Sequence, residues 1–278
     1  MILSMDGVWT ISPQHLKILE IIEELQTQNF KSDFDVIKNK SKVQNVNGYL
    51  QDLIKLNFLK YDTPNYRLTI SGIDCIAINA LRKKGLEKMG TKIGVGKESD
   101  IYSGIFNGKN VALKFHRLGR TSFRSVKNKR DYTKGKIDWY KINKISCFRE
   151  VNYYDLFKNL DVPEYITYNR HIIIMELLNY TSLYMIKLIN PEEIYLKMIN
   201  FIRELWHMGY VHGDFNEFNV MVRESGIKII DFPQCLKSSH IQALDYLKRD
   251  IYSTRKYFEK KYNLIVEDNT FDDLFDSL

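Results

Sequence analysis

Residues 210–232 read YVHGDFNEFNVMVRESGIKIIDF, a pattern that indicates a loop, two short strands and a second loop. Asp214 is followed five residues later by Asn219, and two apolar runs then lead to a second acid, Asp231. Phosphotransferase centres use this order: one aspartate faces the acceptor oxygen, while an asparagine and a second aspartate hold Mg²⁺ against nucleotide phosphates. A plain β-hairpin with polar turns is the alternative, but Asp231 directly after the second strand favours the catalytic interpretation.

The composition excludes several classes of protein. A length of 278 residues suggests about two domains, and 44% hydrophobic residues suffice to build their cores. No apolar run approaches the ~18 residues that span a bilayer, and the N-terminus lacks the pattern of a signal peptide. Cys75, Cys147 and Cys235 are far apart and form no C-x-x-C pair, which argues against disulfides and zinc. We therefore expect a cytoplasmic protein without membrane contact.

The net charge of +7 is concentrated in the middle of the chain. Residues 91–145 hold 14 Lys/Arg and 4 Asp/Glu, which gives +10. Residues 1–90 hold 12 and 10, which gives +2, and residues 146–278 hold 15 and 20, which gives −5. This distribution suggests a polyanionic partner near the middle segment.

The first ninety residues predict a winged helix, which is a helix-turn-helix variant. Ser12 and Pro13 are typical of the N-cap and first position of a helix. Further helices are expected from Ser32, from about Val43 and from Ser71, with strands at 58–61 and 66–69 around a turn at 62–65. Four lysines are positioned to meet phosphates: Lys38, Lys40, Lys42 and Lys55. A winged helix that contacts protein fits as well, so the partner (RNA, DNA or protein) stays open.

The segment TKIGVGKESDIY, residues 91–102, predicts a glycine-rich turn whose backbone N–H groups approach phosphate. Alone, a plain hairpin turn fits equally well. The apolar strand at 111–114 adds weight, because it ends in Lys114, which in kinases pairs with the α/β-phosphates and a glutamate of the next helix. We choose Glu150 over Asp155 for that glutamate, since it falls on the apolar face of a helix expected at 146–158 and needs a cation there. The alternatives are a lysine in solvent and a glutamate at the helix rim.

Residues 117–144 are basic and lack apolar periodicity, so we expect a flexible loop there. A solvated insertion is the simpler interpretation, and a contact arm for RNA or the nucleotide pocket is the favoured one, since loops this long are often functional. Its cations would be Arg117, Arg120, Arg124, Lys127, Lys129 and Arg130, and its stacking residues Phe123, Tyr132, Trp139 and Tyr140.

The second half of the chain predicts strands at 162–168 and 171–178, and helices at 191–208 and about 241–262. Asn190, Pro191 and Gly209 mark the ends of the first helix as N-cap, first position and C′. In a kinase, backbone groups at Glu176 and Leu178 would meet the adenine, with Met175 behind them; a plain buried strand predicts the same apolar run. We interpret His212 as a structural loop histidine.

Only 47 residues follow Asp231, and this shortness is informative. Asp231-Phe232-Pro233 lacks the glycine of the usual D-F-G motif, and no A-P-E motif follows. Gly213 stands where ordinary kinases carry arginine, so the catalytic loop has no group to grip an activation-loop phosphate. We therefore expect neither an activation loop nor a helical substrate lobe.

The chain resembles the RIO-type atypical kinases, in particular the archaeal-like Rio-two subfamily, which has an N-terminal winged helix. The matching motifs are GVGKESDIY (94–102), VALKFHRLGRTSFR (111–124), KRDY (129–132), RE (149–150), NRH (169–171), HGDFNEFN (212–219), IDFPQ (230–234) and SSH (238–240). Small departures are Val95, where the family often has Ile, and Cys235, where it often has Met.

The resemblance implies a role for each matching residue. Asp214 is the catalytic aspartate, Asn219 and Asp231 bind Mg²⁺, and Lys114 pairs with Glu150. The phosphates are covered by Gly94, Val95, Gly96, Lys97, Glu98 and Ser99. The family resembles an ATPase switch as much as a protein kinase, with Asp231 as a transient phosphate acceptor, and its members act in maturation of the small ribosomal subunit.

We therefore predict an α+β chain with a winged-helix domain at 1–90 and a compact bilobal protein-kinase-like domain at 91–278, with an N-lobe at about 91–175 and a C-lobe at about 179–278. The predicted function is an atypical serine/threonine kinase or ATPase that uses ATP and Mg²⁺, with Mn²⁺ as an alternative metal. Its expected partner is the immature small ribosomal subunit, and its phospho-acceptor is an unidentified protein or the chain itself. The alternatives are an aminoglycoside-type phosphotransferase and a non-catalytic, nucleotide-sensing scaffold that binds nucleic acid.

Overall fold

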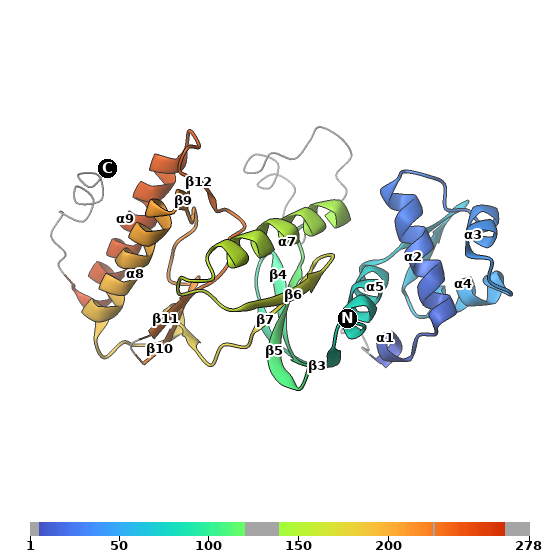
Figure 1. Cartoon of the computed structure of the whole chain (residues 1–278), viewed down its shortest axis with the longest axis horizontal. Helices are drawn as coiled ribbons and strands as arrows, with labels where there is room; N and C mark the ends of the chain where they lie inside the picture. The colour runs from blue at the N-terminus through green and yellow to red at the C-terminus, as the bar shows by residue number, and fades with distance from the viewer. Residues whose placement is uncertain (1–5, 120–138, 225, 265–278) are drawn as a thin grey trace. The chain divides into compact units, whose positions relative to one another are not determined.

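The computed structural model describes residues 6–119, 139–224 and 226–264 (Figure 1). The chain forms two compact units, one of residues 1–145 with 168–173 and the other of residues 146–167 with 174–278. The predicted domain boundary near residue 90 falls inside the first unit and stays a prediction. None of the helices in the described ranges is both long and apolar enough to cross a membrane.

The first unit begins with one short helix, followed by three helices and a β-hairpin, and these last elements confirm the predicted winged-helix order. The elements are α1 (Asp6–Thr10), α2 (Pro13–Thr27), α3 (Phe34–Ser41), α4 (Val46–Lys55), β1 (Leu59–Asp62), β2 (Asn65–Leu68) and α5 (Ile70–Arg82). The two strands are antiparallel and pair from Leu59 with Leu68 to Asp62 with Asn65. The core lies between α2, α4 and α5 and includes Ile18, Leu50 and Ile76.

Capping residues explain where these helices begin. Ser12 caps α2 with Pro13 at its first position, as predicted. Two predicted helix starts are displaced by one or two residues. Asp33 caps α3, because the buried hydroxyl of Ser32 donates to the carbonyl of Tyr66 instead, at 2.6 Å. Thr69 caps α5 in place of Ser71, since its hydroxyl accepts the N–H of Gly72 at 3.0 Å. Each observed cap lies within two residues of the predicted helix start. Such small displacements are expected where several neighbouring Ser, Thr and Asp side chains can accept the first N–H groups of a helix.

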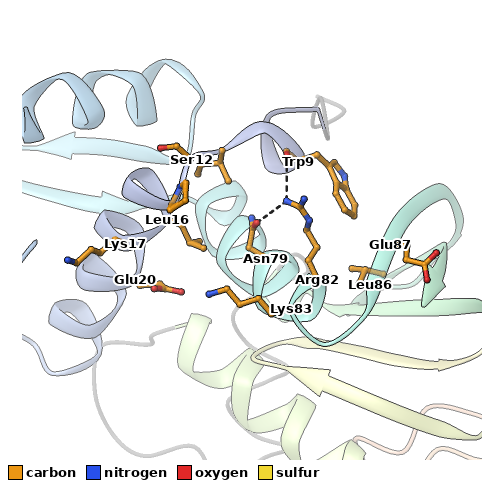
Figure 2. A pocket seen from close by; sticks show the side chains of 12 residues that line it. Trp9, Ser12, Leu16, Lys17, Glu20, Asn79, Arg82, Lys83, Leu86 and Glu87 are labelled. Carbon is orange, nitrogen blue, oxygen red and sulfur yellow. Dashed lines mark hydrogen bonds between the residues drawn. The ribbon is translucent and has the colours of Figure 1, made fainter. Parts of the chain in front are cut away.

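The short helix α1, which the sequence analysis did not predict, lies against α5. The guanidinium of Arg82 stacks 4.6 Å from the ring of Trp9 and donates to Asn79 at 3.1 Å. The amide of Asn79 in turn donates to the carbonyl of Val8 at 3.2 Å. Figure 2 shows these side chains at the wall of a cavity of about 730 Å³ that α2, α5 and the start of β3 complete.

A five-stranded sheet follows in the order β3-β4-β5-β7-β6. Its strands are β3 (Leu86–Val95), β4 (Ser99–Phe106), β5 (Lys109–His116), β6 (Tyr165–Asn169) and β7 (Ile172–Glu176). The first three form an antiparallel meander within the first unit. The backbone N–H of His116 donates to the carbonyl of His171 at 2.9 Å, which fixes the start of β7 beside β5.

Helix α7 (Trp139–Leu156) begins seven residues before the predicted start at 146. The aromatic and polar residues 139–145 belong to the helix, because Asn143 bonds the carbonyls of Trp139 at 2.8 Å and Leu118 at 3.4 Å. The predicted inward residues Cys147, Val151, Tyr154 and Phe157 are all buried. Together with these buried residues, the helix provides one wall of the core of the second unit.

The rest of the second unit consists of short strands and two long helices. They are β8 (Thr181–Ser182), η1 (Leu183–Met185), α8 (Pro191–His207), β9 (Tyr210–Val211), β10 (Val220–Arg223), β11 (Gly226–Ile229), β12 (Leu236–Lys237) and α9 (Ala243–Tyr262). Asn190 caps α8, with Pro191 at its first position, as predicted. β10 and β11 form the predicted hairpin, and β12 pairs with β9, so the chain returns after Asp231 to the strand that precedes Asp214.

Candidate active site

The predicted phosphate-covering segment is the hairpin between β3 and β4. Val95 pairs with Asp100 across the hairpin, and the N–H of Gly96 donates to the carbonyl of Ser99 at 2.8 Å. The side chains of Val95 and Lys97 at the tip are exposed. Gly96, between these two residues, has no side chain, which leaves the backbone of the tip accessible, as a phosphate-covering loop requires.

Lys114 lies on β5, the central strand of the five-stranded sheet, and not at an exposed edge. It pairs with Ile101 of β4, and only 6% of its surface is exposed. This burial rules out the alternative of a lysine in solvent. A buried ammonium group needs polar or charged partners. The strand that carries Lys114 is thus hydrogen-bonded directly to the strand that leaves the glycine turn.

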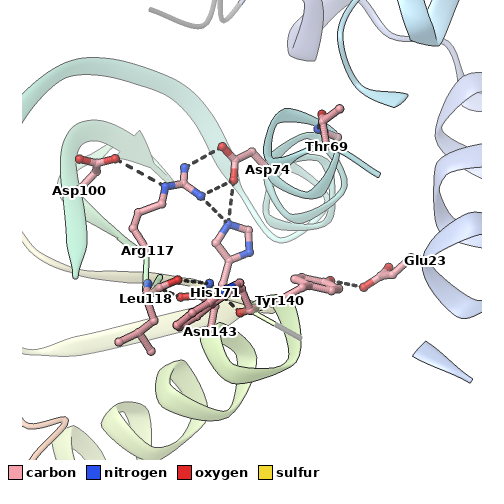
Figure 3. A network of polar contacts seen from close by, with 11 residues as sticks. Glu23, Thr69, Asp74, Asp100, Arg117, Leu118, Tyr140, Asn143 and His171 are labelled. Atoms are coloured by element: carbon pink, nitrogen blue, oxygen red, sulfur yellow. Dashed lines mark hydrogen bonds and ion pairs between the residues drawn. The ribbon is translucent and has the colours of Figure 1, made fainter. Parts of the chain in front are cut away.

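Behind this hairpin, Arg117 joins a buried polar network (Figure 3). Its guanidinium binds the carboxylate of Asp74 through two bonds of 2.8 and 2.7 Å, and it lies 3.5 Å from a carboxylate oxygen of Asp100. Burial alone would raise the pKa of Asp74, but Arg117 and the hydrogen bond from His171 hold it below its usual range. The expectation that Arg117 contacts RNA or nucleotide is therefore wrong: its side chain is 11% exposed and already engaged.

The expected stacking residue Tyr140 is also internal. Its hydroxyl donates to Glu23 of α2, and Arg170 binds the same carboxylate through bonds of 2.8 and 2.6 Å. Burial and the neighbouring Glu23 raise the pKa of Tyr140. The hydroxyl of Tyr140 is thus engaged within the protein, and the role of its ring in base stacking stays a prediction. The loop residues at 120–138, among them five of the six predicted cations, lie outside the described residues.

In the second unit, Asp214 and Asn219 occur together in the loop between β9 and β10. The side-chain amide of Asn219 donates to the carbonyl of Asp214 at 2.9 Å. Two further amides face the carboxylate of Asp214: Asn216 at 3.3 Å from one oxygen and Gln234 at 3.3 Å from the other. The carboxylate is therefore held in one orientation while remaining partly exposed.

Asp231 is brought to the same loop by the hairpin of β10 and β11. The N–H of Ile230 donates to the carbonyl of Asn219 at 3.0 Å, which places Asp231 one residue beyond that contact. Asp231 has a φ of +71°, in the left-handed region that non-glycine residues seldom adopt. Such strained conformations cluster at functional sites because the surrounding structure holds them there.

Asn219 and Asp231 fit a magnesium ion by the chemistry of their donors. The carbonyl of Asp214 can only accept, so the nitrogen of the Asn219 amide faces it and the amide oxygen is directed elsewhere. No group of three His, Cys, Asp or Glu side chains that could hold a metal ion is present within the described residues. Mg²⁺ does not need one, since it is usually held by one or two protein oxygens together with nucleotide phosphates and water.

Asp250 of α9 holds the backbone around Asp214, a role that the sequence analysis missed. Its carboxylate accepts the N–H of Gly213 at 2.8 Å and the N–H of Phe215 at 3.1 Å. Burial raises the pKa of Asp250 to about 7, although both N–H groups favour the charged form. The available signal was its place on the buried stripe of the helix, three residues after Leu247 and four before Thr254.

The loop leaves no room for a side chain at Gly213. Its φ is +78°, and a Cβ atom at this position would lie 2.7 Å from the carbonyl of Gln234. The carbonyl of Gly213 accepts a hydrogen bond from Arg249 of α9. Nearby, the buried His212 contacts the ring of Phe232 at 4.9 Å, which confirms its structural role.

The remaining predicted residues belong to α7 and β7. Glu150 is 0% exposed, which excludes the alternative of a glutamate at the helix rim, whereas Asp155 is exposed. The pairing of Glu150 with Lys114 stays a prediction. Met175 is buried, and the N–H of Glu176 already donates to the carbonyl of Glu164 at 2.8 Å. An adenine contact at Glu176 would therefore use its carbonyl oxygen, and the contacts of Met175, Glu176 and Leu178 stay predictions.

Comparison with known families gives two matches that together cover most of the chain. Residues 100–271 match the RIO domain, and residues 8–84 match the N-terminal domain of Rio2. An aminoglycoside-type phosphotransferase would not account for the second match, which falls on the winged-helix elements.

Individual relatives agree with both matches. The chain is 40% identical to the serine/threonine-protein kinase rio2 of Dictyostelium discoideum, over 78% of this chain and 44% of the relative. It is 38% identical to the RIO-type serine/threonine-protein kinase Rio2 of Methanocaldococcus jannaschii, over 86% of this chain and 93% of the relative. The chain thus spans about half of the first relative and nearly all of the second.

A solved structure has the same fold throughout. The Rio2 kinase from Chaetomium thermophilum, in an ADP/Mg²⁺–phosphoaspartate complex, superposes with a TM-score of 0.86 at 28% identity, over 100% of this chain and 89% of that one. The chain therefore belongs to the RIO family of atypical serine/threonine-protein kinases and, within it, to the Rio2 group.

Proposed function

We propose that this protein is a serine/threonine kinase and ATPase that uses ATP with Mg²⁺ and acts in maturation of the small ribosomal subunit. One observation carries the proposal: Asp214 and Asn219 share a loop, and the residue before Asp231 is hydrogen-bonded to that loop. It is supported by the family, and by the ADP and Mg²⁺ bound in the related Chaetomium structure.

Each residue would contribute positioning or charge, which supply most of the catalysis in phosphoryl transfer. Bound Mg²⁺ would neutralise phosphate charge, and the oxygens of Asn219 and Asp231 would hold it. Lys114 would bind the phosphates beneath the hairpin of residues 94–99. Asp214, oriented by Asn216 and Gln234, would accept the proton of the attacking hydroxyl or water, and Asp231 is the proposed transient phosphate acceptor.

The enzymatic part of the proposal is tested by Mg²⁺-dependent ATP turnover of the full chain. Asp231→Asn should lower turnover by about 100-fold or more, because the substitution removes a charged metal ligand. Asp155→Asn, at an exposed acid of α7, is the matched control and should retain wild-type turnover. Turnover that survives in Asp231→Asn would refute the assigned metal site.

The ribosomal part of the proposal has separate support. Residues 91–145 carry a net charge of +10, which suits an RNA partner. The winged helix supports the proposal less well, because two of its four lysines that were predicted to contact phosphate lie beside acids. Lys40 lies 2.8 Å from Glu24, and Lys55 lies 3.9 Å from Asp52. Co-sedimentation with purified immature small subunits tests the proposal. Binding that weakens steeply with salt is expected, and an absence of co-sedimentation at low salt would contradict it.

A further inference from the structure

A buried network of Asp74, Asp100, Arg117 and His171 joins elements that are far apart in the sequence of the first unit. Asp74 belongs to α5, the last helix of the winged-helix segment, and Asp100 is the second residue of β4, directly after the glycine turn. Arg117 follows the end of β5 and joins the two acids (Figure 3). One side chain therefore connects the N-terminal helices to the hairpin that is proposed to cover the phosphates.

Arg117 contacts the hairpin at two points on either side of Ser99. Its backbone N–H donates to the carbonyl of Glu98 in the turn at 2.6 Å. Its side chain lies 3.5 Å from the carboxylate of Asp100, which Lys92 also approaches at 3.3 Å. These contacts restrain both the turn and the first residues of β4.

The other side of Arg117 is fixed by Asp74 with a specific geometry. Two parallel bonds join the guanidinium to the carboxylate, and such a fork sets the plane of both groups as well as their distance. Lysine has the same charge but cannot form the fork. The side chains of Asp74 and Asp100 are each 3% exposed, so the loss of one acid would leave Arg117 with a buried and imbalanced charge.

His171 ties the same acid to the sheet. Its Nε2 lies 2.8 Å from Asp74, and because the carboxylate accepts, this nitrogen carries the proton. Burial lowers the pKa of His171, so the ring is a neutral donor that adds no second cation to the network. Asp74 therefore acts as a common anchor for the starts of β7 and β4.

We propose that Arg117 is a positioning residue for nucleotide binding, and that it holds the hairpin of residues 94–99 in place from its anchor Asp74 on the N-terminal segment. A hairpin that is already held in one conformation loses less conformational freedom when the nucleoside triphosphate binds, which favours binding. The inference rests on the proposed function, since it assumes that this hairpin covers phosphates. It predicts that the N-terminal helices contribute to nucleotide affinity without touching the nucleotide.

A second, partly buried ion pair in the same unit provides a matched control. Glu23 of α2 binds Arg170 in the turn before β7 with bonds of 2.8 and 2.6 Å, and it also accepts from Tyr140. This pair likewise connects the N-terminal helices to the sheet, but neither residue contacts the hairpin in any described interaction. Glu23→Gln should therefore lower stability and leave nucleotide affinity unchanged.

The test compares Asp74→Asn, Arg117→Lys and Glu23→Gln in the full chain. Hydrogen exchange of the Gly96 amide is measured without nucleotide, and the Kd of a fluorescent ADP analogue is measured with Mg²⁺. Both network variants should speed exchange at Gly96 and weaken binding by about tenfold, within the usual range of coupling between sites of roughly 5- to 150-fold. Glu23→Gln should change neither.

The inference is overturned if both network variants lower the melting temperature while exchange at Gly96 and the Kd stay at wild-type values, because the network would then be structural only. Should Asp74→Asn not fold, Arg117→Lys decides the question, since it keeps the charge. If the wild type binds no nucleotide, the proposed function fails, and exchange at Gly96 still shows whether the network holds the hairpin.

Discussion

Asp250 supports Asp214 from a separate helix: its carboxylate accepts the backbone N–H groups of the two residues that flank Asp214, at 2.8 Å and 3.1 Å. The proposed catalytic aspartate is therefore positioned through its backbone by α9 and through its carboxylate by Asn216 and Gln234.

Loss of the Asp250 carboxylate should impair turnover more than substrate binding. In Asp250→Ala the two N–H groups lose their acceptor, and a small displacement of Asp214 costs about 100-fold in kcat. Asp245→Asn changes an exposed acid on the same helix and should leave kcat unchanged. Steady-state kinetics with ATP measure both variants; a kcat for Asp250→Ala within twofold of wild type would contradict the positioning role.

Asp250 should also give the protein a characteristic pH dependence of stability. Burial raises its pKa to about 7 from an ordinary value of 3.8, so the folded state binds this proton more tightly than the unfolded state. The resulting stabilisation is present below about pH 4 and is lost as the pH rises through about 7. Urea unfolding between pH 5 and 8 should therefore show the stability of the wild type falling relative to that of Asp250→Asn. A difference that does not vary with pH would count against the raised pKa.

Two glycines with similar backbone conformations should respond differently to alanine. Gly213 and Gly209 have φ values of +78° and +84°, but a Cβ would lie 2.7 Å from a carbonyl at Gly213 and 3.7 Å from the nearest atom at Gly209. Gly209→Ala should cost about 1 kcal/mol from backbone strain alone. Gly213→Ala should cost roughly 1–3 kcal/mol more, because its neighbour is backbone and must move. Equal unfolding free energies in the two variants would show that the steric argument is wrong.

Nucleotide binding should require Lys114 but not Lys109, although both lysines belong to β5. Lys114→Met removes the buried cation that is proposed to meet the phosphates, and an ATP affinity at least tenfold lower is expected. Lys109→Met, at the exposed start of β5, should bind like the wild type. Titration calorimetry with Mg²⁺ and an ATP analogue distinguishes them, and equal affinities would remove Lys114 from the site.

The cysteines should be unreactive in the folded protein. All three are buried, and burial raises the pKa of Cys75 to about 12 and raises that of Cys235 further. The thiolate is the reactive form, so alkylation at pH 8 should be slow until urea unfolds the chain. Rapid modification of Cys75 before unfolding would show that its helix opens locally.

The sequence predicted elements that depend on local signals, and missed roles that depend on distant partners. The caps at Ser12 and Asn190 and the hairpin before Asp231 were found because neighbouring residues determine them. Asp74 and Asp250 were missed because their partners lie 43 and 35 to 37 residues away. An acid on the apolar face of an amphipathic helix was the available signal in both cases. Arg117 was misassigned for the same reason: a basic run shows its charge but not which of its members the fold buries.

The most direct test of the proposed function is Mg²⁺-dependent ATP hydrolysis by wild type and Asp214→Ala, each with and without purified immature small ribosomal subunits. We predict turnover that the subunits stimulate and that Asp214→Ala lowers by about 1,000-fold or more, because the loss of a catalytic base and of its orienting contacts combine. Equal turnover by wild type and variant would contradict the assignment of Asp214 and the phosphotransferase account. Turnover that requires Asp214 but ignores the subunits would contradict only the ribosomal part.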